Sequence, residues 1–188
     1  MRRVCVYCGS NVGAHPDYAA AARDLAAVLV RHELQLVYGG ASKGLMGILA
    51  DAMLEAGGIV HGVIPGLLEG KEIAHPGLTE LHVVASMHDR KTMMAALSDA
   101  FIALPGGFGT LDELIEILTW GQLRFHDKPC GVLNVRGYFD RLLAYLDHAC
   151  GEGFLRIENR SMLVAESDAA TLIQRFERYT APNVEKWM

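Results

Sequence analysis

The residues best suited to chemistry lie in a glycine-rich segment and in the helix expected to follow it. The segment reads Pro105-Gly106-Gly107-Phe108-Gly109-Thr110-Leu111-Asp112-Glu113. Glycine permits close approach of a ligand to the backbone, and amide groups at the start of a helix attract anions. Glu113 lies one turn past the glycines, where a carboxylate can meet a ribose or a water molecule. The segment indicates an anionic ligand held beside a carboxylate.

Glu113 has a second interpretation that involves no ligand. Thr110 and Glu113 have the spacing of a capping box, in which Thr110 is the N-cap and Glu113 reaches back to its amide. The position of Glu113 on a glycine-rich rim favours a catalytic role instead. Glu116, one turn further along the same helix face, either supports the site or is solvated.

Two adjacent cations, Arg90 and Lys91, begin the preceding helix in the run Met87-His88-Asp89-Arg90-Lys91, with Ser86 as the expected N-cap. Cations in a first turn oppose the helix macrodipole, which favours acids there by about 0.3 to 1 kcal/mol per charge. Asp89 offsets them locally, or an anionic ligand or Glu113 does so within a site. The guanidinium of Arg90 suits bidentate contact with phosphate or carboxylate.

Glycine also follows two other expected strands, in Gly9-Ser10 and in Gly39-Gly40. Three such loops on one rim suggest a phosphate-bearing ligand. The segment from Gly39 to Gly44 starts like a P-loop, but Leu45-Met46 stands where Lys-Ser/Thr would hold phosphates and magnesium. Asp112 replaces the third glycine of a dinucleotide fingerprint. A mononucleotide therefore fits better than a nucleoside triphosphate or a dinucleotide.

Strand and helix patterns alternate along the whole chain, which is typical of βαβ units with a parallel sheet and helices on both faces. Ligands of such sheets bind at the carboxyl ends of the strands. We expect an α/β, Rossmann-like single domain over residues 1–180 and a loosely attached tail over 181–188. The expected strands are 4–7, 34–38, 59–64, 81–84, 101–104, 131–135 and 162–164, and the expected helices are 16–31, 45–56, 87–98, 110–123, 138–150 and 168–179.

Length and composition agree with one folded domain. The chain has 188 residues, of which 51% are hydrophobic and 21% charged, which excludes the composition of disordered chains. Its net charge is −5, and its 17 Lys and Arg form no basic stripe, so a nucleic acid polymer is not expected as a partner. We expect neither a signal peptide nor a membrane span, because the apolar stretch after Arg2-Arg3 is too short for either, and we expect a cytoplasmic location.

Neither a metal nor another cofactor is expected. Cys5 and Cys8 have CxxC spacing, but on a strand these two residues point to opposite faces of the sheet. The eight histidines include no HExxH pair, and Glu72-x-x-His75 lacks the second copy of a di-iron bundle.

In these residues the chain resembles the LOG family, the cytokinin riboside 5′-monophosphate phosphoribohydrolases. Residues 105–113 match the PGGxGTxxE motif of that family. Residues 39–47 resemble its second glycine motif, and residues 87–91 its Arg-Lys element. The likeness covers nearly the whole chain in the order of the family.

The resemblance implies a homodimer that hydrolyses the N-glycosidic bond of an adenosine 5′-monophosphate-type nucleotide, releasing base and ribose 5-phosphate. It implies Arg90 and Glu113 as the catalytic residues. Several helical residues independently favour a homodimer, because Leu114, Ile115, Ile117, Leu118 and Trp120 cover more than one side of their helix. The candidate substrate-binding residues are Gly39, Gly40, Gly44, Glu72, Arg90, Lys91, Gly106, Gly107, Phe108, Gly109, Thr110, Leu111, Asp112, Glu113 and Thr119.

Two other functions stay open. A broader purine nucleotide nucleosidase shares the chemistry without a preference for N6-modified bases. A non-catalytic carrier, as in the related molybdenum cofactor carriers, would hold a phosphate-bearing ligand on the same glycine rim. The presence of both Arg90 and Glu113 argues against a carrier. Members of the LOG family were formerly labelled possible lysine decarboxylases. This sequence contains no evident pyridoxal-phosphate lysine motif that would support that activity.

Overall fold

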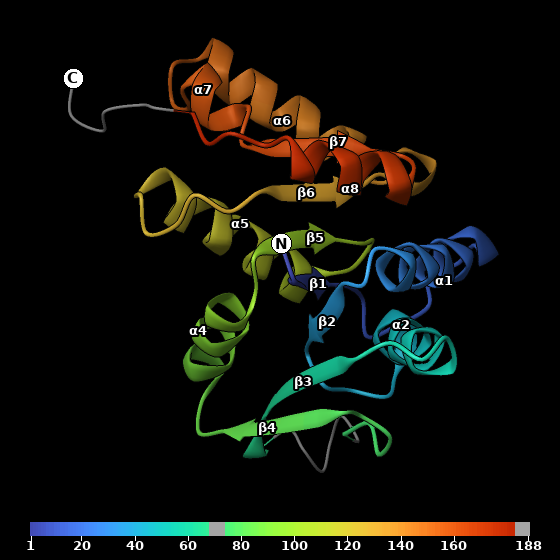
Figure 1. Cartoon of the computed structure of the whole chain (residues 1–188). Coiled ribbons are helices and arrows are strands. Elements are labelled where there is room, and N and C mark those ends of the chain that lie inside the picture. The colour runs from blue at the N-terminus through green and yellow to red at the C-terminus, as the bar shows by residue number, and fades with distance from the viewer. Residues whose placement is uncertain (68–73, 183–188) are drawn as a thin grey trace.

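The computed structural model describes residues 1–67 and 74–182. Seven strands, all parallel, form one sheet in the order β4-β3-β2-β1-β5-β6-β7 (Figure 1). The Rossmann-like α/β fold predicted from the sequence is confirmed. The strands are β1 (Arg3–Tyr7), β2 (Gln35–Tyr38), β3 (Val60–Pro65), β4 (Glu80–Val84), β5 (Ala100–Ala103), β6 (Cys130–Leu133) and β7 (Leu163–Glu166).

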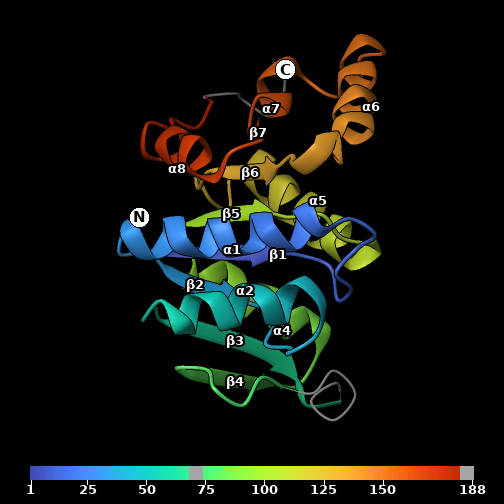
Figure 2. The same cartoon turned by 90° about the vertical axis from the view of Figure 1, so that its right-hand side faces the viewer.

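Helices cover both faces of the sheet. Those on one face, α1, α2 and α8, pack in one apolar cluster, and α4, α5 and α6 pack on the opposite face (Figures 1 and 2). None of the helices within the described ranges combines the length and apolar character needed to cross a lipid bilayer. The helices are α1 (Pro16–Arg31), α2 (Gly44–Glu55), α4 (Met87–Leu97), α5 (Phe108–Gln122), α6 (Asp140–Gly151), α7 (Ile157–Arg160) and α8 (Ala169–Glu177), with a short 3-10 turn η1 (Val135–Gly137).

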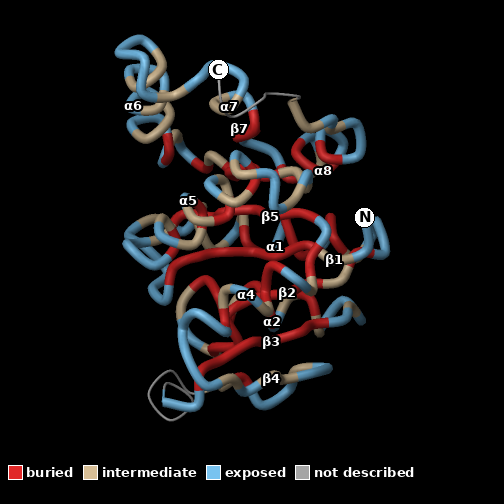
Figure 3. Tube along the Cα trace, turned by 90° about the vertical axis from the view of Figure 1, so that its left-hand side faces the viewer, coloured by how far each residue is buried: buried red, intermediate tan, exposed pale blue. Residues whose placement is uncertain are grey.

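The strands in the middle of the sheet are buried because both of their faces are covered. Buried backbone runs along β1, β2, β3 and β5, whereas β4, at the edge, is half-buried or exposed (Figure 3). Alternation along β1 places Cys5 in the core under α5 and Cys8, just beyond the strand, in the core under α1. The predicted placement of these two cysteines on opposite faces of the sheet is confirmed.

The order of the strands shows where along the sheet a ligand is expected to bind. From β1 the chain winds outward through β2, β3 and β4, and then returns to β5 on the other side of β1. In open parallel sheets, ligands bind at the carboxyl ends of the strands where the winding direction reverses. Here that point lies between Gly9, after β1, and Pro105, after β5, and the Gly9 amide donates to the Pro105 carbonyl at 3.1 Å.

The start of α5 differs from the prediction. The helix begins at Phe108, so Gly107 is the N-cap and Thr110 lies inside the first turn. The capping box of Thr110 and Glu113 is therefore wrong. The backbone of Gly107 is extended, with φ −94° and ψ −150°, and the helix starts at the next residue. By contrast, the predicted N-cap of α4 is confirmed, since Ser86 Oγ accepts from the Asp89 amide at 3.1 Å.

Candidate active site

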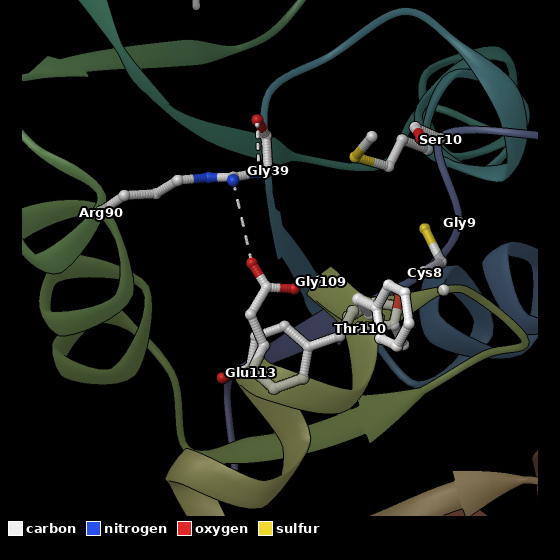
Figure 4. A pocket seen from close by; sticks show the side chains of 13 residues that line it. Cys8, Gly9, Ser10, Gly39, Arg90, Gly109, Thr110 and Glu113 are labelled. Atoms are coloured by element: carbon white, nitrogen blue, oxygen red, sulfur yellow. Dashed lines mark hydrogen bonds and ion pairs between the residues drawn. The ribbon is translucent and has the colours of Figure 1, made fainter.

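A cavity of about 190 Å³ opens at the carboxyl ends of β1, β2 and β5 (Figure 4). All three glycine-containing loops predicted to share a rim contribute to its wall. Arg90 enters from α4 and Glu113 from α5, and the two side chains point toward each other. The residues lining the cavity are Val6, Tyr7, Cys8, Gly9, Ser10, Gly39, Met46, Arg90, Gly107, Phe108, Gly109, Thr110 and Glu113.

The guanidinium of Arg90 is buried, with 8% of the side chain exposed. Its Nε donates to the carbonyl of Val63 in β3 at 3.1 Å, and its Nη2 donates to the carbonyl of Gly39, after β2, at 3.2 Å. These bonds replace the water that a buried cation loses. They also fix the plane of the guanidinium and direct Nη1 toward the cavity.

Gly39 is required by this arrangement. A Cβ atom at position 39 would overlap Nη2 of Arg90 and crowd the sulfur of Met46. The absence of a side chain at Gly39 is therefore what gives the guanidinium its place beneath the loop.

Arg90 Nη1 and Glu113 Oε1 are 3.8 Å apart, and the Glu113 side chain is 12% exposed. This distance exceeds that of a hydrogen bond, so the contact is an ion pair across the cavity wall. Since both groups border the cavity, a ligand there meets a fixed cation and a fixed anion side by side.

The Glu113 charge also affects the thiol and phenol at the floor of the cavity. Burial and, after it, repulsion by Glu113 raise the pKa of the Cys8 thiol. Burial is likewise the largest cause that raises the pKa of Tyr7, with Cys5 and Glu113 adding to it. Both groups stay neutral near pH 7, so Cys8 is not a thiolate nucleophile.

The start of α5 forms part of the cavity wall and has the features of an anion-binding helix N-terminus. Its N-cap, Gly107, supplies no capping side chain, and the first turn holds no acidic residue. The first amides of a helix lack partners within the helix and carry the positive end of its dipole. A Cβ at Gly107 or Gly109 would meet nothing within 4 Å, so the fold itself leaves space beside this backbone. That space allows a phosphate to approach the amides directly.

Lys91 lies next to the cavity and binds two carboxylates of α5. Its Nζ is 2.9 Å from Glu116 Oε2 and 3.1 Å from Asp112 Oδ2. Burial works to lower the pKa of Lys91, but the hydrogen bonds to Glu116 and Asp112 outweigh it and raise that pKa. Lys91 therefore fastens α4 to α5 beside the Arg90–Glu113 pair. Glu116, whose side chain is 28% exposed, is therefore bound to Lys91 and is not only solvated.

The predicted site residues divide into two groups. The cavity wall includes Gly39, Arg90, Gly107, Phe108, Gly109, Thr110 and Glu113. Thr119 is exposed further along α5 and donates its hydroxyl to the Ile115 carbonyl at 2.7 Å. Glu72 lies outside the described residues. The other predicted residues that do not line the cavity are Gly40, Gly44, Lys91, Gly106, Leu111 and Asp112.

The cavity wall also contains residues that are not among the candidate substrate-binding residues. Val6 and Tyr7 end β1, Cys8, Gly9 and Ser10 follow it, and Met46 comes from the first turn of α2. The sequence predicts Gly9-Ser10 as one of the three glycine loops on the rim, and the structure places it there. Met46 carries no signal in the sequence, because it is one of several apolar residues along α2.

A second cavity, of about 250 Å³, adjoins the first and shares Gly9, Ser10 and Gly107 with it. Gly106 belongs to this cavity, where its carbonyl accepts a hydrogen bond from the Tyr138 hydroxyl at 2.6 Å. The rim is thus hollowed on both sides of the glycine loop.

The fold and the site together define a Rossmann-like protein with a cavity beside a buried arginine–glutamate pair at the carboxyl ends of its strands. The family profile described as "Possible lysine decarboxylase" matches residues 46–176. The cytokinin riboside 5′-monophosphate phosphoribohydrolase LOG5 of Arabidopsis thaliana is 50% identical over 97% of this chain and 80% of its own length. The enzyme LOG1 of the same plant, with the same description, is 48% identical over 99% and 87%. The chain belongs to this LOG family.

Solved structures of lower sequence similarity share the fold. The molybdenum cofactor carrier protein of Chlamydomonas reinhardtii superposes with a TM-score of 0.71 at 21% identity, covering 95% of this chain and 97% of the carrier. A molybdenum cofactor binding protein of Rippkaea orientalis gives a TM-score of 0.70 at 19% identity, over 95% and 97%. At this identity the likeness concerns the fold alone.

Replacing Gly39 by Ala should lower the stability of the protein, because the new Cβ displaces Nη2 of Arg90 from the Gly39 carbonyl. A lost hydrogen bond of a charged group costs about 1.5 to 3 kcal/mol, which urea unfolding measures. Gly151→Ala is the matched control, since a Cβ there meets nothing within 4 Å. Equal unfolding free energies for the two variants would contradict the role given to Gly39.

Proposed function

We propose that this protein hydrolyses the N-glycosidic bond of cytokinin-type nucleotides, the N6-modified adenosine 5′-monophosphates, and releases the free base and ribose 5-phosphate. The observation that carries the proposal is the Arg90–Glu113 pair, which borders a cavity that is also lined by the start of α5. The names of the LOG relatives specify this reaction and this class of substrate.

Glu113 is the proposed catalytic carboxylate. Departure of the base develops oxocarbenium character on the ribose, which a neighbouring carboxylate stabilises. The same carboxylate accepts a proton from the attacking water as the oxygen of that water bonds to the anomeric carbon. The C–N bond electrons leave with the base, which takes up a proton.

Arg90 acts by position and charge. A guanidinium remains protonated throughout the ordinary pH range, so it cannot donate the proton that the leaving base needs. Its Nε and Nη2 are already bound to the Val63 and Gly39 carbonyls, which leaves Nη1 facing Glu113. We assign Arg90 to the orientation of Glu113 and of the ribose.

The phosphate is proposed to bind at the start of α5, along the backbone from Gly107 to Thr110. Open amides and the positive end of the helix dipole favour an anion there. Lys91 and Asp112 support this region through the attachment of α4 to α5. No metal or other cofactor takes part in the proposed reaction, and its small water-soluble reactants fit a cytoplasmic location.

We also propose that the protein is a homodimer. Of the apolar residues of α5, Leu114 and Ile117 are buried in the chain's own core, whereas Ile115 is 41% exposed. Phe108, at the mouth of the cavity, is 93% exposed, and Met87 of α4 is 43% exposed. These side chains give the face beside the cavity an apolar character that a second copy would cover. Light scattering should give twice the chain mass at micromolar concentration, and a monomer mass would contradict the dimer.

The 5′-phosphate should be required for turnover. Each charge-assisted hydrogen bond contributes about 1.5 to 3 kcal/mol, so the loss of two should lower kcat/KM about 100-fold or more. The measurement compares the release of free base from adenosine and from AMP, each with and without an N6-isopentenyl group. Equal kcat/KM for nucleoside and nucleotide would contradict the proposed phosphate site. Equal turnover of plain and N6-modified AMP would identify a broader purine nucleotide nucleosidase, and binding without base release would identify a carrier.

Glu113→Gln should keep the fold and lower kcat by about 10² to 10⁴, the usual contribution of a positioned acid or base. Glu116→Gln is a matched control, because it makes the same change one turn away on a carboxylate that also binds a cation of α4. Base release by the two purified variants is compared with that of the parent protein. Wild-type kcat in a folded Glu113→Gln variant would remove Glu113 from the mechanism. Arg90→Lys keeps the charge but loses the planar group, so a loss of kcat there indicates orientation rather than charge.

A further inference from the structure

Two histidines and a glutamate meet at the amino ends of β3 and β4, whereas the catalytic cavity lies at the carboxyl ends of the strands. His61 is the second residue of β3 and pairs in register with Glu80, the first residue of β4. His82 follows Glu80 by two residues, so the side chains of Glu80 and His82 lie on one face of the strand. The topology thus brings three metal-binding side chain types to one corner of the sheet.

The three side chains converge on a small volume. His61 Nδ1 is 3.0 Å from one carboxylate oxygen of Glu80, and His82 Nε2 is 3.5 Å from the other. One donor atom from each of the three residues lies within 4.8 Å of the other two. Ligand atoms of a tetrahedral zinc ion, at about 2.0 to 2.2 Å from the metal, are about 3.3 to 3.6 Å apart. The His82–Glu80 distance of 3.5 Å lies in that range, and the His61–Glu80 distance of 3.0 Å is shorter. The two distances end on different oxygens of the Glu80 carboxylate.

A hydrogen-bond chain fixes the proton of His61. Arg3 Nε, which can only donate, lies 3.0 Å from Gln35 Oε1, so this atom is the amide oxygen. The same oxygen is 3.0 Å from His61 Nε2, which must therefore carry a proton. In a neutral imidazole the lone pair is then on Nδ1, which faces the Glu80 carboxylate at 3.0 Å. A proton on Nδ1 makes this contact an ion pair, and a metal cation would equally satisfy the Nδ1 lone pair and the carboxylate.

His82 offers a second ligand atom. Its Nε2 is buried and makes no hydrogen bond within the described part of the chain, and its nearest charged neighbour is Glu80. A buried polar atom without a partner costs free energy, which a bound cation would relieve. The side chain as a whole is 24% exposed, so an ion can enter from solvent.

We propose that His61, Glu80 and His82 bind a Zn²⁺ ion, with water as the fourth ligand. Two imidazole nitrogens and one carboxylate are a common zinc donor set, whereas Mg²⁺ and Ca²⁺ prefer oxygen ligands. Gln35 is the outer partner that such sites have, since its oxygen accepts the remaining N–H of a metal-bound histidine. The ion fastens the edge strand β4 to β3 and takes no part in the proposed hydrolysis.

The binding experiment uses untagged protein freed of metal with a chelator. Titration calorimetry with ZnCl₂ should give one Zn²⁺ per chain. Thermal unfolding should shift upward by about 5 °C or more when free Zn²⁺ is 100 times its Kd. Co²⁺ should replace Zn²⁺ and give the visible absorption of a tetrahedral site.

Three variants test the ligands and one serves as the control. His82→Ala and Glu80→Gln each remove a proposed ligand from a partly exposed position. Both should lower Zn²⁺ affinity by at least as much as Gln35→Ala does. Gln35→Ala removes the outer partner and should lower affinity about 10- to 100-fold. His148→Ala changes an exposed histidine of α6 and should leave the affinity unchanged.

Two outcomes would overturn the zinc site. One is Zn²⁺ binding that His82→Ala and Glu80→Gln leave at the parent affinity. The other is no shift in thermal unfolding with Zn²⁺, which would leave His61 and Glu80 as an ion pair only. Because the readouts are metal affinity and stability, they are independent of the proposed hydrolysis.

Discussion

The burial of one guanidinium organises the active end of this protein. Arg90 carries a positive charge into a place where 8% of its side chain is exposed, and such a charge is stable only with partners on every side. The backbone carbonyls of Gly39 and Val63 supply two of them, and the Glu113 carboxylate supplies the opposite charge. Loops after β2, the strand β3 and the helices α4 and α5 are therefore held in one arrangement by one side chain.

The ion pair of Lys91 with Glu116 joins the same two helices as the pair of Arg90 with Glu113, but it does not border the cavity. Arg90 and Lys91 are adjacent on α4, and Glu113 and Glu116 are one turn apart on α5, so two cations of one helix meet two carboxylates of the other. The contact of Lys91 with Glu116 is 2.9 Å, short enough for a hydrogen bond, and serves attachment. The contact of Arg90 with Glu113 is 3.8 Å and borders the cavity, where its charges are available to a ligand.

Much of this arrangement follows from the sequence. Periodicity predicted the strands and the longer helices, and glycines after apolar runs predicted the rim. The start of α5 was predicted wrongly, because Thr110 has the side chain of an N-cap but the backbone of Gly107 is the one that turns into the helix. Met46 and the group of His61, Glu80 and His82 were not predicted, since strand register and packing, rather than spacing along the chain, bring them together. The four-residue helix α7 is too short to show a periodic pattern.

Gly107 and Gly109 differ from Gly39 in what their lack of a side chain provides. At Gly39 it makes room for another part of the fold, and at Gly107 and Gly109 it leaves room for a ligand. A methyl group at either position would touch nothing in the described part of the chain, whereas one at Gly39 would collide with Arg90. Packing within the chain therefore does not require a glycine at position 107 or 109, whereas an occupant of the cavity would. A lineage that stopped binding phosphates would lose these two glycines early and keep Gly39 for as long as it kept the buried arginine. The pattern of glycine loss among descendants would thus record which function disappeared first.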